Sequence, residues 1–333
     1  MYRLHICLGL ALALYAVLIG LTGAALVFRD PMVRASRPDL YASPTAASAI
    51  DSDRALSLVR AAYPGWTPLT ATFPNAYTPY LMFYSIRDRE AREVYVTADG
   101  SRIVGERDPS TGTLAWIARL HTSLLGGRTG RRINGGLACG LLLLAVSGPI
   151  LWRRRKYLHS AIGLACAPFL LWLCLTGAYF VWPQQYVSVI GSVLATEPVV
   201  RIPPSSGSSL SVAQLVERAT AAIPDKAVYR VSIPNSPSAP VQLTYLDGTP
   251  DEFHRVSTIS MNPVTGVILQ VTRNPDRSAG SALIGWLSAS HFGVFGGFPI
   301  RLLWVLGGIS VAFLAITGIA ARLTKMLSKM KAR

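Results

Sequence analysis

Charged residues are scarce in this 333-residue chain, and four long stretches lack them altogether. Only 15% of the residues are charged, whereas 51% are hydrophobic, and the mean hydropathy is +0.38. This balance excludes an intrinsically disordered chain and argues against an ordinary soluble enzyme. The stretches without Asp, Glu, Lys or Arg are Leu4–Phe28, Ile133–Trp152, Leu158–Trp182 and Leu302–Ala321. Each is long enough to cross a hydrocarbon core of about 30 Å as a helix.

Acidic residues are absent outside two polar segments. Residues 29–115 hold ten acidic and ten basic residues, and residues 183–290 hold seven of each, so both segments are neutral. The formal net charge of +15 therefore comes from basic residues that flank the apolar stretches. This distribution is typical of a protein embedded in a lipid bilayer, and no nucleic-acid partner is expected.

Short basic segments predict the orientation in the membrane. Residues 153–157 contain four basic residues, and residues 322–333 contain five and no acidic one. The positive-inside rule places both segments, and hence both termini, in the cytoplasm. The long polar segments then face the periplasm, as expected for a multi-pass protein of the bacterial inner (cytoplasmic) membrane. The first stretch is too long for the core of a signal peptide and lacks a clear cleavage site, which favours a retained helix over a signal peptide.

Cysteine and nucleotide-binding motifs are also scarce or missing. The four cysteines, Cys7, Cys139, Cys166 and Cys174, all lie in the apolar stretches, so no disulfide framework is implied. The sequence shows no phosphate-binding loop, dinucleotide-binding glycine motif, Ser/His/Asp arrangement or Cys-x-x-Cys motif. We therefore do not expect the chain to bind its own nicotinamide or flavin.

What the chain does contain is an internal duplication. The segment that begins Leu4-His5 matches the one that begins Leu158-His159, and a Thr-Gly pair follows each histidine by seventeen residues. His121 and His291 form a second matched pair, each preceded by a tryptophan and followed 26 residues later by Ser-Gly or Thr-Gly. Each half has an even number of spans, which predicts two parallel repeats about a pseudo-two-fold axis along the membrane normal.

The predicted fold class is a membrane α-helical protein with four transmembrane helices in two parallel repeats and two small α+β periplasmic domains. In the polar segments we expect helices near 52–62 and 211–222, and strands near 81–86, 93–96, 228–233, 241–245, 257–261 and 267–271. The predicted boundaries are 1–28, 133–152, 158–182 and 302–321 for the membrane helices, 29–115 and 183–285 for the periplasmic domains, 116–132 and 286–301 for periplasmic-surface segments, and 153–157 and 322–333 for the cytoplasmic loop and tail.

Four of the five histidines are the duplicated ones, and they are the candidate ligands. By the symmetry of the repeats, His5 and His159 form one pair at the cytoplasmic face, and His121 and His291 form another at the outer face. A lone interfacial histidine is usually a tolerated amphipathic residue, but four in register favour ligation. Zinc usually takes four ligands, whereas two histidines in apolar surroundings suit a haem with two axial imidazoles. The unmatched His254 is expected to be a surface residue.

Glycines and arginines near the histidines complete the candidate site. Gly9 and Gly163 follow their histidines by one helical turn, where a missing side chain leaves room for a flat macrocycle or, alternatively, for close helix packing. Basic residues on the outer face are expected to pair with haem propionates, an anionic substrate or lipid headgroups; they are Arg128, Arg131, Arg132 and Arg301. Trp116 and Trp286 are expected to be interfacial anchors or, alternatively, to stack near the outer haem.

In the order of its motifs the chain resembles the PepSY-associated transmembrane family over nearly its whole length. The motifs are Leu-His-x-x-x-Gly, His121-Thr-Ser-Leu-Leu-Gly-Gly127, Gly130-Arg-Arg-Ile-Asn-Gly-Gly136, Trp152-Arg-Arg-Arg155 and Asn262-Pro-Val-Thr-Gly266. The first polar segment departs from the pattern, with Thr97-Ala-Asp-Gly100 in place of the last motif. The family includes inner-membrane ferric-siderophore reductases of the FoxB type. The resemblance implies two periplasmic PepSY domains, haem held by His5, His121, His159 and His291, and reduction of Fe(III) in imported siderophores.

The leading hypothesis is a transmembrane electron conduit with two haem b groups per chain, one near each membrane face. A cytoplasmic or membrane electron donor would reduce the inner haem, and the outer haem would reduce a ferric siderophore in the periplasm and release its iron. A weaker form of this hypothesis has haem at one face only. The alternative is a non-redox, membrane-anchored PepSY module that binds a periplasmic peptide or peptidase. A transporter is disfavoured because no acidic residue lies in any span.

Overall fold

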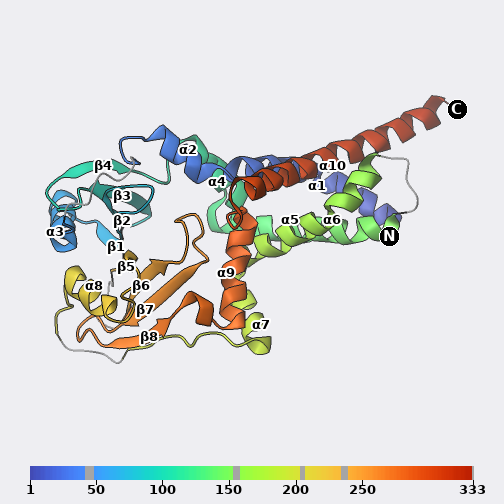
Figure 1. Ribbon diagram of the computed structural model, residues 1–333. Coiled ribbons are helices and arrows are strands. Elements are labelled where there is room, and N and C mark those ends of the chain that lie inside the picture. Colours follow the sequence, from blue (N-terminus) through green and yellow to red (C-terminus); the bar gives the residue numbers. More distant parts are fainter. Residues whose placement is uncertain (42–48, 153–157, 203–206, 234–238, 332–333) are drawn as a thin grey trace. The chain divides into compact units, whose positions relative to one another are not determined.

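The computed structural model describes residues 1–41, 49–152, 158–202, 207–233 and 239–331 of the chain (Figure 1). The predicted basic loop at 153–157 lies outside these residues. The chain divides into two compact units. We call them the membrane unit, with Met1–Arg29, Gly112–Val193 and Leu283–Arg333, and the sheet unit, with Asp30–Thr111 and Leu194–Ala282.

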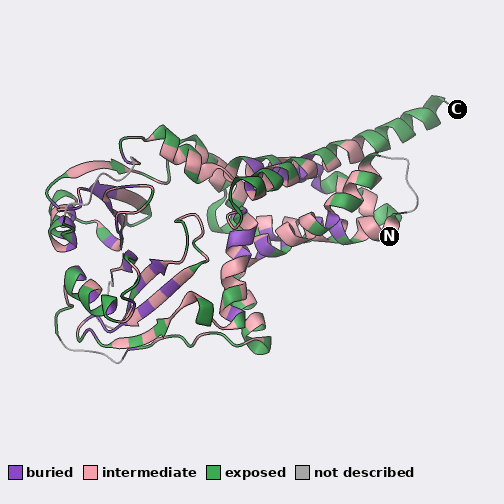
Figure 2. Ribbon diagram, in the orientation of Figure 1, coloured by how far each residue is buried: buried purple, intermediate pink, exposed green. Residues whose placement is uncertain are grey.

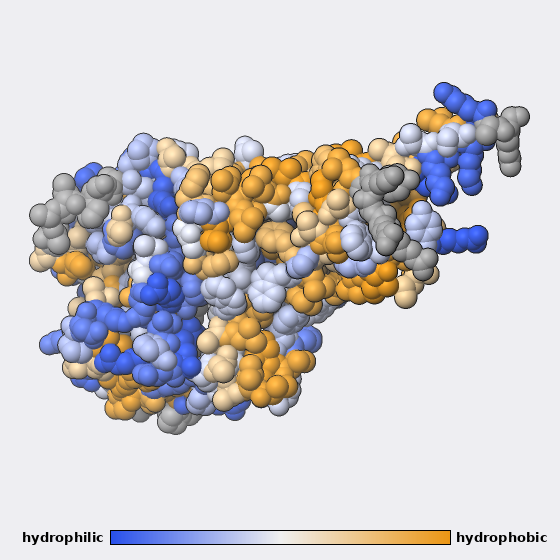
Figure 3. Space-filling view, turned by 45° about the vertical axis from the view of Figure 1, so that its right-hand side comes forward, coloured by the Kyte–Doolittle hydropathy of each residue, from blue (hydrophilic) through white to orange (hydrophobic). Residues whose placement is uncertain are grey.

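The membrane unit contains four helices that are long and apolar enough to cross a membrane. They are α1 (Tyr2–Leu26), α5 (Gly127–Leu151), α6 (Leu158–Val181) and α10 (Gly297–Lys331). Large apolar side chains on these helices are exposed, for example Leu14 at 80% of its surface. In Figure 3 hydrophobic side chains cover much of the helical surface. A surface of this kind is stable only against an apolar environment such as lipid.

Two of these helices begin earlier than the charge-free stretches predicted. α5 begins at Gly127 instead of 133, and α10 begins at Gly297 instead of 302 and continues to Lys331. Gly127 and Gly297 have φ angles of 56° and 65°, and each starts its helix directly after a shorter one. Charge ends a predicted apolar run but does not end a helix, which explains the difference. The shorter helices of the membrane unit are α4 (Gly112–Ser123), α7 (Pro183–Val193) and α9 (Ala279–Phe292), the last of which begins in the sheet unit, and α2 (Arg29–Ser36) lies in the sheet unit from Asp30 onward.

The sheet unit is built on one antiparallel sheet of eight strands, in the order β4-β3-β2-β1-β5-β6-β7-β8. Each half of the chain contributes four strands preceded by one helix, α3 (Ser52–Ala62) or α8 (Val212–Thr220). The strands are β1 (Thr67–Thr72), β2 (Leu81–Arg87), β3 (Glu90–Val96), β4 (Ile103–Arg107), β5 (Val228–Ser232), β6 (Val241–Leu246), β7 (Val256–Met261) and β8 (Ile268–Thr272), with a short 3-10 helix η1 (Asn274–Asp276) after them. The halves join where β1 pairs with β5, Ala71 opposite Val231.

The core of the sheet unit comes from alternate strand residues and one face of each helix. Phe83, Leu243 and Ile259 are fully buried, together with Val59 of α3 and Leu215 of α8 at 1% and 3% exposure. Figure 2 shows buried positions alternating with less buried ones along the strands. Burial of one sheet face against the helices explains why both helices and six of the strands follow the predicted apolar patterns.

The helices α3 and α8 are capped and linked at their first turns. Asp51 accepts a hydrogen bond from the backbone N–H of Arg54, and Ser211 forms a capping box with Gln214. The Asp53 carboxylate accepts the backbone N–H of Val212 at 2.8 Å. A carboxylate at a helix N-terminus satisfies donors that the helix itself leaves open. One residue of the first half thus caps the helix of the second.

The two turns whose sequences differ adopt the same backbone conformation at their glycine. Gly100, after β3, and Gly266, before β8, both have φ of 69°. A Cβ atom on Gly100 would lie 2.6 Å from the backbone nitrogen of Ala55. The turn therefore requires glycine for its angle and for its contact with α3. The two polar segments, predicted as separate small units, also share one continuous sheet.

Candidate functional site

Each of the four long helices packs against two of the others. α1 packs against α10 and α5, and α6 packs against α5 and α10. Leu12, Leu141, Cys174 and Val311 are buried between them. Small residues allow the closest approach, as is usual between membrane helices, where the surrounding lipid is as apolar as the side chains. This packing positions the ends of the helices that carry histidines.

The structure brings two of the predicted ligands into one pair. His121 lies near the end of α4 and His291 near the end of α9, and their ring centroids are 6.4 Å apart with an interplanar angle of 50°. Two imidazoles on opposite sides of one metal ion, each with a metal–nitrogen distance of about 2 Å, have centroids roughly 6 Å apart. The spacing of these rings therefore fits a metal ion with two axial histidines.

The second pair lies at the other end of the bundle. His5 is in the first turn of α1 and His159 in the first turn of α6. On α1, seventeen residues separate His5 from Thr22, which contacts His121. At 1.5 Å per residue this separation is about 25 Å, so the two pairs stand near opposite faces of a membrane-thick bundle.

All four histidines contact a hydroxyl group of a different helix through the same ring atom, Nδ1. In each case the hydroxyl belongs to one of the Ser-Gly or Thr-Gly pairs of the duplication. The contacts are His5 with Ser147 at 2.7 Å, His121 with Thr22 at 3.0 Å, His159 with Thr317 at 3.2 Å and His291 with Thr176 at 2.9 Å. Because Nδ1 is engaged, Nε2 is the ring nitrogen that remains for ligation.

The surroundings keep the histidines of α4 and α9 neutral. Burial lowers the pKa of His121 to about 4, and burial together with repulsion by His121 lowers the pKa of His291 to about 3. Aromatic rings supply much of the apolar environment, since Phe180 lies 5.3 Å and Phe292 lies 5.9 Å from the ring of His291. A metal ion takes the neutral imidazole, so this environment favours ligation.

The two predicted glycines have only ordinary van der Waals neighbours. A Cβ atom on Gly9 would meet only Leu144, at 3.9 Å, and one on Gly163 only Leu314, at 3.6 Å. Neither contact is close enough to require glycine for helix packing. The structure of the protein alone thus leaves room at both positions one turn from the histidines of α1 and α6.

The four predicted arginines occupy two different environments. Arg128, Arg131 and Arg132 are exposed in the first turns of α5, whereas Arg301, in the first turns of α10, is buried with 7% of its surface exposed. The sequence predicts one common role for the four. Their burial separates Arg301 from the other three, because a buried guanidinium requires compensating interactions that exposed ones do not.

A polar link between helices went unnoticed in the sequence. The hydroxyl of Tyr15 donates to Oδ1 of Asn134 at 2.8 Å, and Nδ2 of Asn134 donates to the backbone oxygen of His121 at 2.9 Å. Asn134 lies in the Gly130–Gly136 motif, and this motif is the sequence feature that could have indicated a role for Asn134. At the matching positions of the second half, Phe169 and Trp304 instead form an edge-to-face pair at 5.0 Å.

Among the described residues, no group of three or more His, Cys, Asp or Glu side chains is placed to hold a metal ion. A site of the zinc type is therefore not supported in this part of the chain, and the paired histidines stand as two-ligand sites. His254, predicted as a surface residue, is half-buried between β6 and β7. Trp116 on α4 is exposed, while the Trp286 ring on α9 lies 4.6 Å from that of Phe295.

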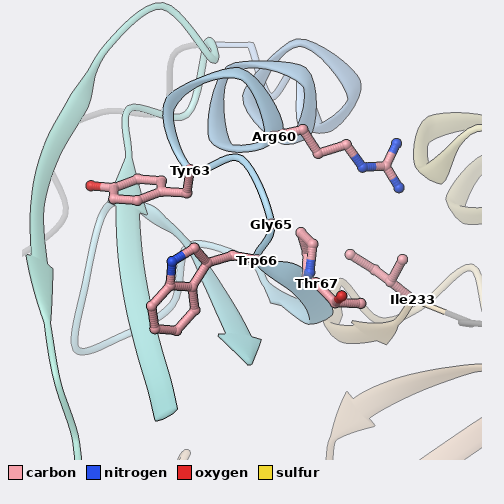
Figure 4. A pocket seen from close by; sticks show the side chains of 7 residues that line it. Arg60, Tyr63, Gly65, Trp66, Thr67 and Ile233 are labelled. Carbon is pink, nitrogen blue, oxygen red and sulfur yellow. The ribbon is translucent and has the colours of Figure 1, made fainter. Parts of the chain in front are cut away.

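The sheet unit contains a separate surface pocket of about 540 Å³ that holds none of the predicted site residues (Figure 4). Its lining consists of Arg60, Tyr63, Gly65, Trp66, Thr67, Pro68 and Ile233. The guanidinium groups of Arg87 and Arg92 each lie 4.7 Å from the ring of Trp66. Both cations are paired with carboxylates, Glu90 and Glu106. The two arginines therefore stack on the Trp66 ring without giving the pocket a net positive charge.

The fold and the histidine pairs define a membrane protein with a four-helix bundle and an antiparallel sheet unit. The chain belongs to the PepSY-associated TM region family, whose model matches residues 2–324. The match covers both units of the structure. No curated protein matches the chain.

Proposed function

We propose that this protein is a haem-containing reductase that carries electrons across the bacterial inner membrane to ferric siderophores in the periplasm. The observation that carries the proposal is the 6.4 Å spacing of His121 and His291, with a hydroxyl contact at Nδ1 of each ring. These two histidines would hold one haem b, and His5 and His159 a second. Haem supplies one-electron chemistry, so one electron converts each Fe(III) to Fe(II), which siderophores bind more weakly.

The chain's own residues perform three tasks in this proposal. The histidines would provide neutral ring nitrogens to haem, and the hydroxyl groups that contact their Nδ1 atoms would orient them. Apolar side chains buried in the bundle would separate the two pairs, which lie about 25 Å apart along α1. The exposed arginines at the start of α5, Arg128, Arg131 and Arg132, would attract an anionic ferric chelate or pair with haem propionates.

We further propose that the two halves are parallel repeats and that each supplies one PepSY domain of the sheet unit. Three equivalences support this interpretation. Each half provides one helix and four strands to the sheet, each carries one histidine of each pair, and each provides two hydroxyl groups to histidines. With both termini in the cytoplasm, the sheet unit faces the periplasm and the pair of α4 and α9 lies at the outer face.

An optical spectrum of the detergent-purified protein, oxidised and then reduced with dithionite, tests the proposal together with a pyridine haemochrome count. We expect two low-spin b-type haems per chain. Proteoliposomes with an internal reductant should then reduce an external ferric siderophore, detected by an Fe(II)-specific dye. Haem-free protein after expression with ample haem would contradict the proposal and favour a non-redox module that binds a periplasmic peptide or peptidase.

A further inference from the structure

We infer that the four hydroxyl–glycine pairs are positioning elements that hold each histidine as its Nδ1–H tautomer and thereby select Nε2 as the haem ligand. The pairs are Thr22-Gly23, Ser147-Gly148, Thr176-Gly177 and Thr317-Gly318. This inference rests on the proposed haem binding and assigns a role to residues that the duplication preserves but that touch no metal.

The hydrogen-bond inventory of the threonines determines the tautomer. A hydroxyl group has one hydrogen to donate. The hydroxyl of Thr22 donates it to the backbone oxygen of Leu18 at 2.7 Å, and that of Thr176 donates to the backbone oxygen of Trp172 at 2.8 Å. Their oxygens are left only as acceptors for the ring. With its hydrogen directed to the helix backbone, each hydroxyl favours a proton on Nδ1 of His121 and of His291, which leaves the lone pair on Nε2.

The same arrangement recurs at the other end of the bundle with one variation. Thr317 donates to the backbone oxygen of Phe313 at 2.9 Å and so also accepts from its histidine. Ser147 lies 3.4 Å from the backbone oxygen of Leu144, so its own donor bond is longer. Serine also has more rotamer freedom than threonine. We call each hydroxyl–glycine pair that holds a histidine ring a clamp. The clamp on His5 is therefore the least constrained of the four.

The glycine of each pair provides the space in which the ring lies. A Cβ atom on Gly23 would stand 3.0 Å from Cε1 of His121, and one on Gly177 would stand 3.2 Å from Cε1 of His291. The corresponding distance is 3.3 Å at Gly318 and 3.8 Å at Gly148. Three of the four glycines thus face a ring closer than ordinary van der Waals contact would allow for alanine, and Gly148 again shows the looser geometry.

Each clamp also crosses between helices. α1 holds the histidine of α4, α6 holds that of α9, α5 holds that of α1, and α10 holds that of α6. The ring orientation at each site thus depends on how two helices pack. Orientation by a neighbouring helix keeps the ligand geometry rigid, which is the usual requirement for a metal ligand.

The test uses Thr22→Val, which keeps the branched shape and removes the hydroxyl, and Thr22→Ser, which restores it. Haem affinity is measured by haem transfer to apomyoglobin, and ligand geometry by low-temperature electron paramagnetic resonance. We expect Thr22→Val to weaken haem binding at the pair of α4 and α9 by about 10- to 100-fold and to shift one of two low-spin signals. The signal of His5 and His159 should not change, which serves as an internal control for folding. Thr22→Ser should restore both readouts.

A glycine series tests the second half of the clamp. Gly23→Ala should displace the ring of His121 and weaken haem binding at that site, whereas Gly148→Ala should have a smaller effect on the site of His5. Gly136→Ala, which has nothing within 4 Å of its new methyl group, is the matched control on α5.

The outcomes separate the inference from the proposed function. Wild-type affinity and unchanged resonance signals in Thr22→Val and Gly23→Ala would overturn the clamp while leaving two haems per chain in place. Absence of haem from the wild-type protein would overturn the proposed function itself.

Discussion

Gly20 on α1 and Gly308 on α10 lie so close that a Cβ atom on Gly20 would stand 2.5 Å from the backbone oxygen of Gly308. A Cβ atom on Gly308 would in turn stand 2.8 Å from the backbone oxygen of Gly20. The contact is reciprocal and involves backbone atoms, which have no alternative rotamer to adopt. Ala16 and Ala24 extend the same small-residue stripe on α1.

Substitution of either glycine should separate α1 from α10. Gly20→Ala is expected to destabilise the protein by about 1–3 kcal/mol, because overpacking forces the backbones apart. Thermal unfolding in detergent, followed by tryptophan fluorescence, measures the effect. Gly136→Ala on the exposed face of α5 is the control and should leave the melting temperature unchanged or raise it slightly. Equal stability of the two variants would argue against the close packing.

Single histidine substitutions should remove one haem and spare the other. His121→Ala or His291→Ala is expected to reduce the pyridine haemochrome count from two per chain to one, because each removes an axial ligand of the same site. His5→Ala should also leave one haem, but with a different spectrum and potential. If all three variants retained two low-spin haems, the ligand assignment would be wrong.

Gly9 and Gly163 distinguish space for haem from space for packing. The protein alone accommodates a methyl group at Gly9, whose nearest neighbour is Leu144 at 3.9 Å. Gly9→Ala should therefore keep or raise the stability of the haem-free protein, since alanine is the better helix former by about 1 kcal/mol. If a macrocycle lies against this position, the same variant should lose haem at the site of His5 and His159. Retention of both haems would place the macrocycle elsewhere.

A hydrogen-bonded tyrosine pair of the sheet unit, Tyr41 with the buried Tyr95, should contribute to stability independently of haem. The hydroxyls of Tyr41 and Tyr95 lie 2.6 Å apart, and the hydroxyl of Tyr95 donates to Glu93, which is paired with Arg107. Burial raises the pKa of Tyr95, so its hydroxyl stays protonated. Tyr95→Phe should destabilise the protein by about 1–3 kcal/mol, because Tyr41 and Glu93 lose a buried partner. Urea unfolding checks this, with Tyr84→Phe, outside this network, as the control.

The lowered pKa values of His121 and His291 predict an acid-sensitive haem-free protein. A histidine whose folded pKa is depressed stabilises the fold fully above its ordinary pKa of about 6.5. As the pH falls from about 6.5 toward 4, the unfolded state binds protons that the folded histidines do not, and stability declines. The melting temperature of haem-free protein should therefore drop over this pH range. It should drop less steeply in the double variant that combines His121→Asn with His291→Asn. Parallel slopes would mean that these histidines titrate normally.

The four long helices of this protein follow from the apolar pattern of the sequence alone. A charge-free run of twenty or more residues has one stable form in lipid, a helix, because each backbone group must find its partner within the segment. The ends of α5 and α10 do not follow from this rule. Gly127 and Gly297 begin these helices with positive φ a few residues after α4 and α9 end, and the place of that backbone turn depends on packing.

The candidate site was partly evident from the repeated sequence. The register of His121 and His291 predicts that they stand at equal depth, and their rings are in fact 6.4 Å apart. The repeat also revealed the Thr-Gly and Ser-Gly pairs, but not what they contact. Thr22 and His121 are separated by 99 residues, and only the packing of α1 against α4 brings them within 3.0 Å.

The sequence by itself determined which segments are apolar enough to cross a membrane, which residues repeat and where six of the eight described strands lie, because these follow from local polarity and period. Tertiary structure alone decided that β1 pairs with β5 to merge two four-stranded halves into one sheet, and that Arg301 is buried while Arg131 is exposed. Strand pairing and burial depend on which distant surfaces meet. The local pattern of polarity along the chain does not specify which distant surfaces will make that contact.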